Sequence, residues 1–380
     1  MMRRAGSWDI FCRVVDHYGD IGVCWRLARQ LAAERGAAVR LWVDQPPALA
    51  RIWPEVDAGL DAQQCAGVEI RRWSEPLPAV TPHAAVIEAF ACKTPDSFVA
   101  AMAACVPPPV WINLEYLSAE AWVDECHLLP SPHPRLPLIK YFYFPGFTPH
   151  TGGLLRERGL LAARAAFVRD DAARAAFWRS LDMAGPQPQE LRVSLFAYAN
   201  PPAADLLAAW AAGERSITCV VPEGVFGNEL AAFFGETVVA GARPARGNLQ
   251  VAVIPFLQQT DYDRLLWACD INFVRGEDSF VRAQWSGAPL VWHIYPQQDD
   301  AHRVKLDAFV LNHCATMGEA AGAVRALFDA WNGEGDVGGA WRAAERLLPQ
   351  WAAGTAAWSA GLAAQRDLVS ALAEAVESRL

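Results

Sequence analysis

Short apolar runs alternate with helix-like stretches along this chain, and that alternation restricts its fold more than any other feature. The first run, 8–15, is a compact apolar strand. It is followed by the polar break DHYGDI and by a helical pattern over 22–34 that Gly36 ends. Strand-like runs follow at 38–43, 84–90, 109–114 and 137–144. Strands that alternate with helices predict a parallel sheet with crossover connections.

The alternation starts again after residues 183–190, a Gly-, Pro- and Gln-containing segment that we interpret as a linker. The sequence therefore predicts an α/β protein with two doubly wound domains, 1–185 and 190–361, and a C-terminal helix, 362–380, that packs back on the first. Two such domains that face each other across a cleft place a ligand at the carboxyl ends of their strands. The second domain is predicted to have strands at 191–198, 216–221, 249–254, 269–274 and 289–294, and helices at 203–212, 225–234, 261–268, from Asp278, and throughout from about 300.

Charge and cysteine content exclude several classes of protein. The 380 residues carry 33 Lys and Arg against 42 Asp and Glu, a net charge of −9, so we expect no broad basic face for nucleic acid. No window of about 18 apolar residues predicts a membrane span. Asp9, Arg13 and Asp16 interrupt the stretch in which a signal peptide would have its apolar core. The nine cysteines form no Cys-x-x-Cys pair, which favours reduced thiols in a cytoplasmic protein.

Two carboxylates follow the first strand. Asp16 and Asp20 flank His-Tyr-Gly, and Gly19 and Gly22 permit a close approach of the backbone. Two acids four residues apart on a strand-end loop can converge on one cationic substrate. The alternative is that Asp20 only caps the helix that begins near Gly22.

A dinucleotide site is a weaker interpretation of the same loop. Gly19 and Gly22 resemble part of a Gly-x-Gly-x-x-Gly fingerprint, and Asp44 ends the second strand where a ribose-binding acid would lie. The first glycine of the fingerprint is absent, however, and two acids would repel a pyrophosphate. Asp44 is better explained as a strand-end turn residue. The eight histidines lack metal-ligand spacing, and neither a Walker loop nor a Gly-x-Ser-x-Gly elbow occurs, so we expect no metal and no cofactor.

The second domain has a better anion site. Residues 275–279 (RGEDS) follow the strand 269–274 and open a helix, whose first amide groups can bind phosphate with help from Arg275. The alternative is an ordinary helix capped by Asp278 or Ser279. Glu277 does not suit a phosphate cradle and can instead contact sugar hydroxyls or order the loop. Phe256 can stack on a planar base while glutamine or backbone groups contact the edge of that base, although a lone Phe more often belongs to a core. Side chains at several strand ends can line the same crevice: Phe196, Tyr198, Phe256, Gln258, Gln259 and Tyr295.

Three long segments resemble one known family. They are WDIFCRVVDHYGDIGVCWRLARQLA at 8–32, PFLQQTDYDRLLWACD at 255–270 and FVRGEDSFVRAQWSG at 273–287. The chain resembles the bacterial protein-arginine rhamnosyltransferases along its whole length. The resemblance implies a GT-B fold and the transfer of L-rhamnose, with inversion and without a metal, from dTDP-β-L-rhamnose to an arginine of translation elongation factor P. It also implies that the first domain receives the acceptor protein, that the second holds the nucleotide, and that the modified factor rescues ribosomes stalled at polyproline.

The resemblance further implies roles for individual residues. Asp20 matches the general base, Asp16 its partner and Glu277 a third essential acid. This chain has Asp-His-Tyr-Gly-Asp where the family pattern has Asp-Asn-Phe-Gly-Asp, which leaves the acids and the glycine in place. The implied donor-binding residues are His17, Tyr18, Gly19, Phe196, Tyr198, Phe256, Leu257, Gln258, Gln259, Arg275, Gly276, Asp278, Ser279 and Tyr295.

Three other functions remain open at the level of sequence. The first is a GT-B enzyme that glycosylates a small molecule or a lipid precursor. The second is an NAD-dependent oxidoreductase, and the third is a binding protein without catalytic activity, which the retained acids disfavour.

Overall fold

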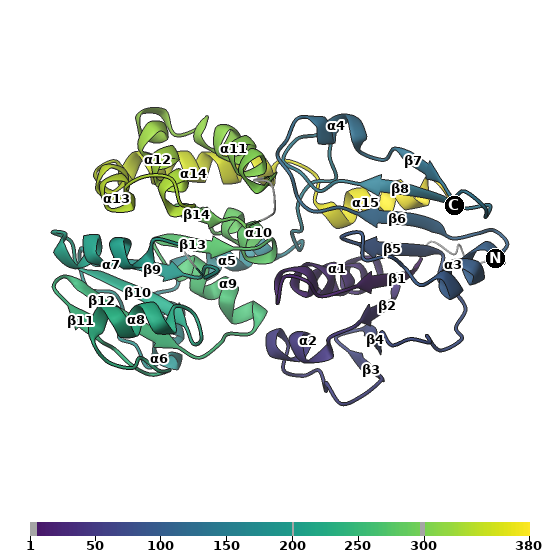
Figure 1. Cartoon of the computed structure of the whole chain (residues 1–380), viewed down its shortest axis with the longest axis horizontal. Helices are drawn as coiled ribbons and strands as arrows, with labels where there is room; N and C mark the ends of the chain where they lie inside the picture. Colours follow the sequence, from purple (N-terminus) through teal and green to yellow (C-terminus); the bar gives the residue numbers. More distant parts are fainter. Residues whose placement is uncertain (1–5, 200, 297–300) are drawn as a thin grey trace. The chain divides into compact units, whose positions relative to one another are not determined.

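The structure, a computed structural model, describes residues 6–199, 201–296 and 301–380, which form two compact units. Unit 1 contains the chain up to Arg158 and the returning segment Gln365–Leu380, whereas unit 2 is Gly159–Ala364. Each unit is built on one mostly parallel sheet covered by helices (Figure 1). The predicted α/β class is therefore confirmed.

Unit 1 is organised around a central first strand. Its elements are β1 (Ser7–Cys12), α1 (Gly19–Arg35), β2 (Ala38–Val43), α2 (Pro46–Ile52), β3 (Ala62–Cys65), β4 (Val68–Arg72), β5 (Ala85–Ala89), α3 (Asp96–Ala103), β6 (Val110–Leu114), α4 (Trp122–Cys126), β7 (Pro130–Pro132), β8 (Ile139–Tyr143) and α15 (Leu368–Glu377). The sheet order is β3-β4-β2-β1-β5-β6-β8-β7. The chain moves outward from β1 to β4 and then returns to β5, so the carboxyl ends of β1 and β5 form the switch point at which α/β sheets bind ligands.

Apolar residues on both faces of this sheet explain why its central strands are continuous hydrophobic runs. On one face Phe11, Trp42 and Trp111 form a core cluster with Phe98 of α3. On the other face α1 packs against β1 and β2. Packing on both faces of the sheet fixes the position of the loop that joins β1 to α1.

Unit 2 repeats the plan with six strands. Its elements are α5 (Leu160–Arg169), α6 (Asp171–Ser180), β9 (Leu191–Leu195), α7 (Ala203–Ala212), β10 (Ile217–Pro222), α8 (Gly227–Phe234), β11 (Ala245–Arg246), β12 (Leu249–Ile254), α9 (Gln259–Ala268), β13 (Ile271–Arg275), α10 (Asp278–Ser286), β14 (Leu290–His293), α11 (Ala301–Cys314), the 3-10 helix η3 (Gly318–Ala320), α12 (Ala321–Trp331), α13 (Val337–Arg346) and α14 (Leu348–Ala363). The order β11-β12-β10-β9-β13-β14 places the switch point between β9 and β13.

The boundary expected at 185–190 lies inside unit 2, because the chain changes unit between Arg158 and Gly159. Helix α6 belongs to unit 2 since Trp178 packs in one core cluster with Val220 of β10 and Ala252 of β12. The predicted linker 183–190 is also held there, because the Arg192 Nη2 atom donates to the carbonyl oxygen of Ala184 at 2.9 Å. Glycine and proline therefore mark a turn before β9 and not a hinge.

The C-terminal segment lies with unit 1. The Tyr143 hydroxyl of β8 donates to the carbonyl oxygen of Leu368 at 3.5 Å, and α15 packs against α1 (Figure 1). Across residues 6–199, 201–296 and 301–380, no helix combines the length and the apolar character that crossing a bilayer requires.

Two strands end earlier than the apolar runs suggest. β1 stops at Cys12 because the next amide groups bond to side chains: Val14 N–H donates to Asp44 Oδ1 at 2.9 Å, and Val15 N–H donates to Asp20 Oδ2 at 2.8 Å. β9 similarly stops at Leu195, and Tyr198 N–H donates to a histidine ring at 3.1 Å.

Candidate functional site

The acid loop (residues 13–20) lies at the switch point of unit 1, and Asp20 organises it. The Asp20 Oδ2 atom accepts the backbone N–H groups of Val15 and Asp16, each at 2.8 Å. The Oδ1 atom accepts the hydroxyl of Tyr116, which follows β6, at 3.3 Å. The capping alternative is wrong, because α1 begins at Gly19 and its N-cap residue is Tyr18, without a side-chain cap bond. Asp20 instead folds the loop that precedes its own helix.

Burial changes the acidity of Asp20. The residue is 2% exposed, and this burial raises the pKa of its carboxyl above the ordinary value. The amide bonds from Asp16 and Val15 lower that pKa in part, whereas the nearby Asp16 carboxylate raises it again. A carboxylate with a raised pKa is a stronger base than an ordinary aspartate.

Gly19 lets the second carboxylate lie against the loop. Its N–H donates to the carbonyl oxygen of Asp16 at 2.6 Å, which closes a tight turn. A Cβ at position 19 would stand 2.5 Å from Asp16 Oδ2, so only glycine leaves that carboxylate in place. His17 lies in the turn with φ of 28°, and its ring is 6.4 Å from that of Tyr18. Asp16 and Asp20 thus share one compact turn.

The structure agrees with the turn role predicted for Asp44. Its carboxylate accepts the Val14 N–H group and so ties the end of β2 to the acid loop. The amide groups that a pyrophosphate would use after β1 are those of Val15 and Asp16, and Asp20 already binds both. This occupancy further weakens the dinucleotide interpretation.

Arg275 lies at the switch point of unit 2, where it joins the ends of β9 and β13. Its guanidinium carbon lies 4.3 Å from the ring centroid of Phe196 and 4.8 Å from that of Tyr198. Its Nη1 atom donates to the carbonyl oxygen of Ala197 at 3.2 Å. The aromatic rings expected to line the crevice therefore hold a cation in position.

The start of α10 follows directly. Gly276 takes a left-handed φ of 61°, and the Trp292 Nε1–H group donates to its carbonyl oxygen at 2.9 Å. The N-cap residue is the half-buried Glu277, which makes no side-chain cap bond, so capping by Asp278 or Ser279 is a wrong prediction. The Ser279 hydroxyl bonds back to the backbone of Arg275 instead. Side-chain bonds thus shape the turn, and the first amide groups of a helix are those that can bind an anion.

The starts of α9 and α10 are linked to each other. The Gln259 Nε2 atom donates to Asp278 Oδ2 at 3.2 Å. One turn further along, the buried Asp263 accepts Arg282 Nε at 2.9 Å and Nη2 at 2.7 Å, a two-point ion pair. These contacts fix the end of α10 at which an anion would bind.

The remaining residues after β12 have separate surroundings. Gln258 Nε2 donates to Asp261 Oδ2 at 2.9 Å, within the first turn of α9. Leu257 packs against the core cluster of Phe177, so it has a packing role that the sequence did not reveal. Phe256 is half-buried where the chain leaves β12.

His293 is a site-adjacent residue that sequence reasoning missed. Its Nδ1 atom accepts the Tyr198 N–H group at 3.1 Å, and its ring lies 5.6 Å from the Tyr198 ring. Burial, and then the charge of Arg275, lower the pKa of His293 to about 4, so the ring is neutral at pH 7. Tyr295 lies 5.2 Å from Tyr198 at 84° and is 43% exposed. The signal that marked Tyr295, a polar ring at a strand end, also marks His293.

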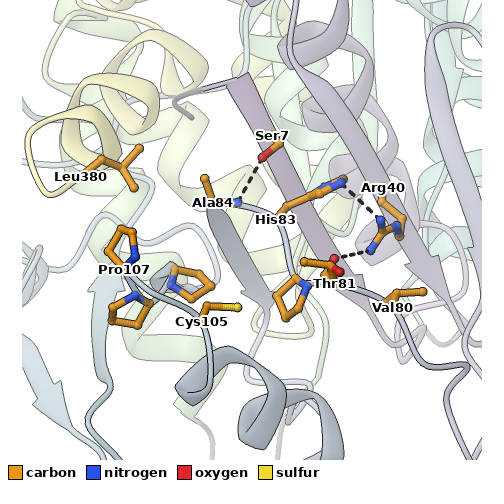
Figure 2. Close-up of a pocket in the computed structure, with 12 residues that line it drawn as sticks. Ser7, Arg40, Val80, Thr81, His83, Ala84, Cys105, Pro107 and Leu380 are labelled. Atoms are coloured by element: carbon orange, nitrogen blue, oxygen red, sulfur yellow. Dashed lines mark hydrogen bonds between the residues drawn. The ribbon is translucent and has the colours of Figure 1, made fainter. Parts of the chain in front are cut away.

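A hollow of about 500 Å³ lies at the other end of the unit 1 sheet, where β1 begins (Figure 2). Val80, Pro107 and Leu380 supply apolar walls, and Arg40 and His83 supply polar ones. This hollow is a second candidate site, of which the sequence gives no hint.

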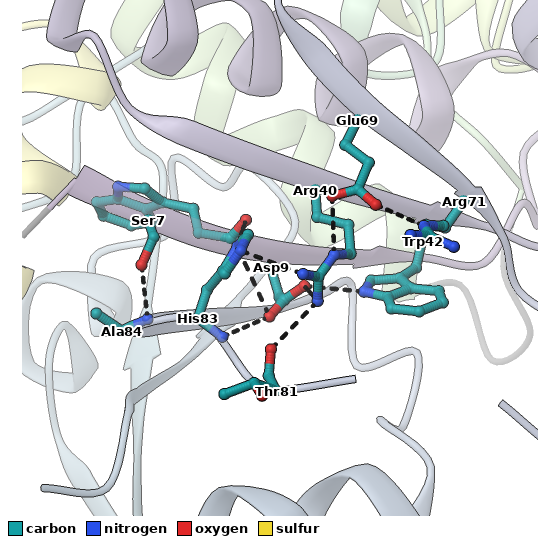
Figure 3. A network of polar contacts seen from close by, with 10 residues as sticks. Ser7, Asp9, Arg40, Trp42, Glu69, Arg71, Thr81, His83 and Ala84 are labelled. Carbon is teal, nitrogen blue, oxygen red and sulfur yellow. Dashed lines mark hydrogen bonds and ion pairs between the residues drawn. The ribbon is translucent and has the colours of Figure 1, made fainter. Parts of the chain in front are cut away.

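A buried ion network accounts for the polar side of this hollow (Figure 3). The fully buried Asp9 accepts Arg40 Nη1 at 3.1 Å, Trp42 Nε1 at 3.0 Å and His83 N–H at 2.8 Å. Arg40 Nε also donates to Glu69 at 3.2 Å. His83 Nδ1 lies 2.9 Å from the carbonyl oxygen of Trp8, so Nδ1 carries the proton and Nε2 accepts from Arg40 at 3.3 Å. The charged side chains of this network pair with one another, and we therefore assign the network a role in the stability of unit 1.

Within the described part of the chain, His, Cys, Asp and Glu side chains form no group of three that could hold a metal ion. The nine cysteines are all free thiols, as the sequence predicts. The predicted residues therefore form two constellations: the acid loop of unit 1, and the ends of β9, β13 and β14 with the starts of α9 and α10 in unit 2.

Comparison with known proteins identifies relatives along the whole chain. Residues 8–377 match the family model described as Elongation-Factor P (EF-P) rhamnosyltransferase EarP. A protein-arginine rhamnosyltransferase of Pseudomonas putida is 50% identical over 368 residues, which cover 96% of this chain and 97% of that protein.

Solved structures agree. One solved structure has 36% identity to this chain and a TM-score of 0.71, and the match covers 98% of this chain and 99% of the other. It is described as the structural basis for EarP-mediated arginine glycosylation of translation elongation factor EF-P. A UDP-glucosyltransferase from Polygonum tinctorium has 12% identity and a TM-score of 0.50 over 98% of both chains, which shows a shared fold alone. The predicted GT-B fold and the resemblance carried by the three sequence segments are confirmed.

Proposed function

This chain belongs to the EarP family of elongation factor P rhamnosyltransferases, and we propose that it transfers L-rhamnose from dTDP-β-L-rhamnose to one arginine side chain of elongation factor P. The observation that carries the proposal is the pair of carboxylates, Asp16 and Asp20, in one tight turn at the switch point of unit 1. A pair of acids suits a cationic acceptor and does not suit a phosphate.

The chemistry of arginine explains why the site needs two acids. A guanidinium has a pKa above about 12 and delocalised lone pairs, so it is a poor nucleophile. Two carboxylates grip it through paired hydrogen bonds and direct one nitrogen at the anomeric carbon. Asp20 then takes the proton. Its Oδ2 atom already accepts two amide groups, so Oδ1 is the oxygen with a lone pair for that proton.

The residues of unit 2 fit the donor. We assign the diphosphate to the amide groups at the start of α10 with Arg275, and the base and sugar to the surrounding aromatic and amide side chains, including Phe256 and Gln259. Negative charge grows on the diphosphate as the sugar leaves, and preorganised donors stabilise it without a metal ion. Glu277, at the N-cap of α10, is assigned to the sugar hydroxyls.

The transfer takes place in one step, in which one bond forms as another breaks. The nitrogen attacks the anomeric carbon opposite the diphosphate, so the C–N bond forms as the C–O bond breaks and the configuration inverts. The bonding electron pair of the C–O bond leaves with dTDP, and the proton of the attacking nitrogen passes to Asp20. Because Asp20 is 2% exposed, the acid loop has to shift before a guanidinium reaches Oδ1.

The acceptor is a folded protein surface, so short arginine peptides should react poorly. A translation factor as substrate places the reaction in the cytoplasm, and the modified arginine would serve ribosomes stalled at polyproline.

Intact-mass analysis of elongation factor P tests the proposal. Incubation with this protein and dTDP-rhamnose should add one deoxyhexose to the factor, and dialysis of the enzyme against EDTA should not reduce the yield. Asp20→Asn should abolish the addition and retain dTDP binding. An unmodified factor, combined with transfer to a small-molecule acceptor, would favour the other glycosyltransferase function.

A further inference from the structure

We propose that Tyr116 is the positioning residue of Asp20, whose hydroxyl holds Oδ1 and so decides which lone pair of that oxygen faces the acceptor arginine. The inference rests on the proposed function, in which Asp20 is the base. Tyr116 comes directly after β6, far from the acid loop in sequence, and its hydroxyl lies 3.3 Å from Asp20 Oδ1. That distance is long for an O–H···O bond, and such contacts often shorten when a substrate binds.

Phe90 supports the Tyr116 ring. The two rings stack with centroids 4.5 Å apart and planes 18° apart. Phe90 is itself fixed, since its N–H group donates to the carbonyl oxygen of Leu114 at 2.7 Å and the residue is only 9% exposed. Because the ring stacks on a buried neighbour, the hydroxyl is held in a defined position next to Asp20.

The backbone that carries Phe90 is strained. Phe90, Ala91 and Lys93 take left-handed φ values of 55°, 52° and 56°, a backbone conformation that is strained for residues other than glycine. This turn follows β5, the strand that forms the switch point with β1. Strain of this kind persists where the surroundings enforce it and is concentrated at functional sites.

Glu88, at the end of β5, enforces the turn. Its Oε2 atom accepts the Thr94 N–H group at 3.2 Å and the Thr94 hydroxyl at 3.1 Å. Its Oε1 atom accepts Lys140 Nζ at 3.0 Å, so the carboxylate is anchored to β8 as well. The buried Glu88 thus holds the turn, the turn holds Phe90, and Phe90 supports the tyrosine that contacts Asp20.

The hydroxyl also has an electrostatic effect on the base. Asp20 is faced by the Asp16 carboxylate, by Tyr116 and by the Cys12 thiol of β1. The Cys12 thiol is neutral, because its side-chain hydrogen bond with Cys24 and its burial raise its pKa well above the ordinary value. Tyr116 is therefore the side chain that lowers the pKa of Asp20 against burial. Without this hydroxyl the pKa of Asp20 would rise, so the base form would be lost at a higher pH than in the wild type.

The test compares Tyr116→Phe with the wild type across pH 5 to 9, using the whole enzyme, elongation factor P and dTDP-rhamnose. The ring stack is kept and only the hydroxyl is lost. We expect kcat to fall by about 10-fold or more, as for one hydrogen bond to a charged group, and the acidic limb to move to higher pH. The affinity for dTDP should not change. Phe90→Leu, which removes the support but keeps the hydroxyl, should move the limb in the same direction.

Controls separate this inference from the proposed function. Tyr141→Phe, on β8 beside Arg379, should leave both kcat and the pH profile unchanged. Asp20→Asn measured in parallel tests the base itself: wild-type turnover there would overturn the proposed role of Asp20. If Asp20→Asn is inactive while Tyr116→Phe keeps the wild-type rate, or loses rate with an unmoved acidic limb, the positioning role alone is overturned.

Discussion

A methyl group at Gly19 would stand 2.5 Å from the Oδ2 atom of Asp16, so the glycine and the carboxylate occupy adjacent space by necessity. Gly19→Ala should therefore push the Asp16 side chain out of the turn. The atom that would clash is the end of a side chain and not backbone, so it can rotate away at little cost in stability. We expect turnover to fall by about 100-fold, the usual effect of a misplacement of about 1 Å, with the melting temperature nearly unchanged.

Gly322→Ala is the matched control, because a Cβ at that helical position of α12 meets no atom within 4 Å. It should keep wild-type turnover. A folded Gly19→Ala enzyme with the activity of this control would show that Asp16 need not lie against residue 19.

Arg275 should determine the affinity for the diphosphate. Phe196 and Tyr198 hold its guanidinium at the switch point of unit 2, at 4.3 Å and 4.8 Å from their ring centroids. Arg275→Met keeps the apolar stem and removes the charge-assisted contact, so the dissociation constant for dTDP should rise by about 10- to 100-fold in titration calorimetry. Arg264→Met, which removes an exposed arginine paired with Asp261 on α9, should bind as the wild type does. Equal affinities in the two variants would remove Arg275 from the anion site.

The sequence predicted the core of both sheets well, because buried parallel strands are continuous apolar runs. It did not predict β3, β4, β7 and β11. Three of these, β3, β7 and β11, are short edge strands with little apolar character. The interior strand β4 was missed because its sequence, VEIRR, alternates apolar and charged residues. The domain boundary was placed too late because the glycine and proline of 183–190 resemble a linker, whereas packing of Trp178 decides the division. Composition cannot reveal on which sheet a helix packs.

The site shows the same limit. Strand-end position identified Asp16, Asp20 and Arg275, since the carboxyl edge of a parallel sheet is where the chain turns. Tyr116 and Phe90 were missed, because their relation to Asp20 depends on which strand lies next to β1. That order, β1-β5-β6, is a property of the sheet and is not visible in the local pattern.

His293 should make unit 2 sensitive to acid. Burial lowers its pKa to about 4 from 6.5, so the folded state resists a proton that the unfolded chain binds. The contribution of this neutral ring to the free energy of unfolding is complete above pH 6.5. It is lost as pH falls toward 4, a difference on the order of 3 kcal/mol.

In His293→Gln a side-chain oxygen can accept the Tyr198 N–H group and does not titrate. Urea unfolding of unit 2 should then depend less steeply on pH between 6.5 and 4, whereas exposed His150→Gln in unit 1 should keep the wild-type slope. Parallel slopes for all three proteins would refute the assignment.

Asp9 should contribute more to stability than any surface acid of unit 1. Its buried carboxylate accepts three donors, from Arg40, Trp42 and the His83 backbone. In Asp9→Asn an amide NH2 group would face one of these donors, and the buried Arg40 would lose a charged partner. Breaking a buried ion pair from one side costs about 3–5 kcal/mol. Hydrogen exchange of the β1 and β2 amides should accelerate accordingly, while amides of unit 2 provide an internal reference.

Asp61→Asn is the matched control. It breaks a pair with Arg72 in which the Asp61 side chain is 87% exposed, and it should cost at most about 1 kcal/mol of stability. If both variants exchange alike, the network in Figure 3 does not stabilise the sheet.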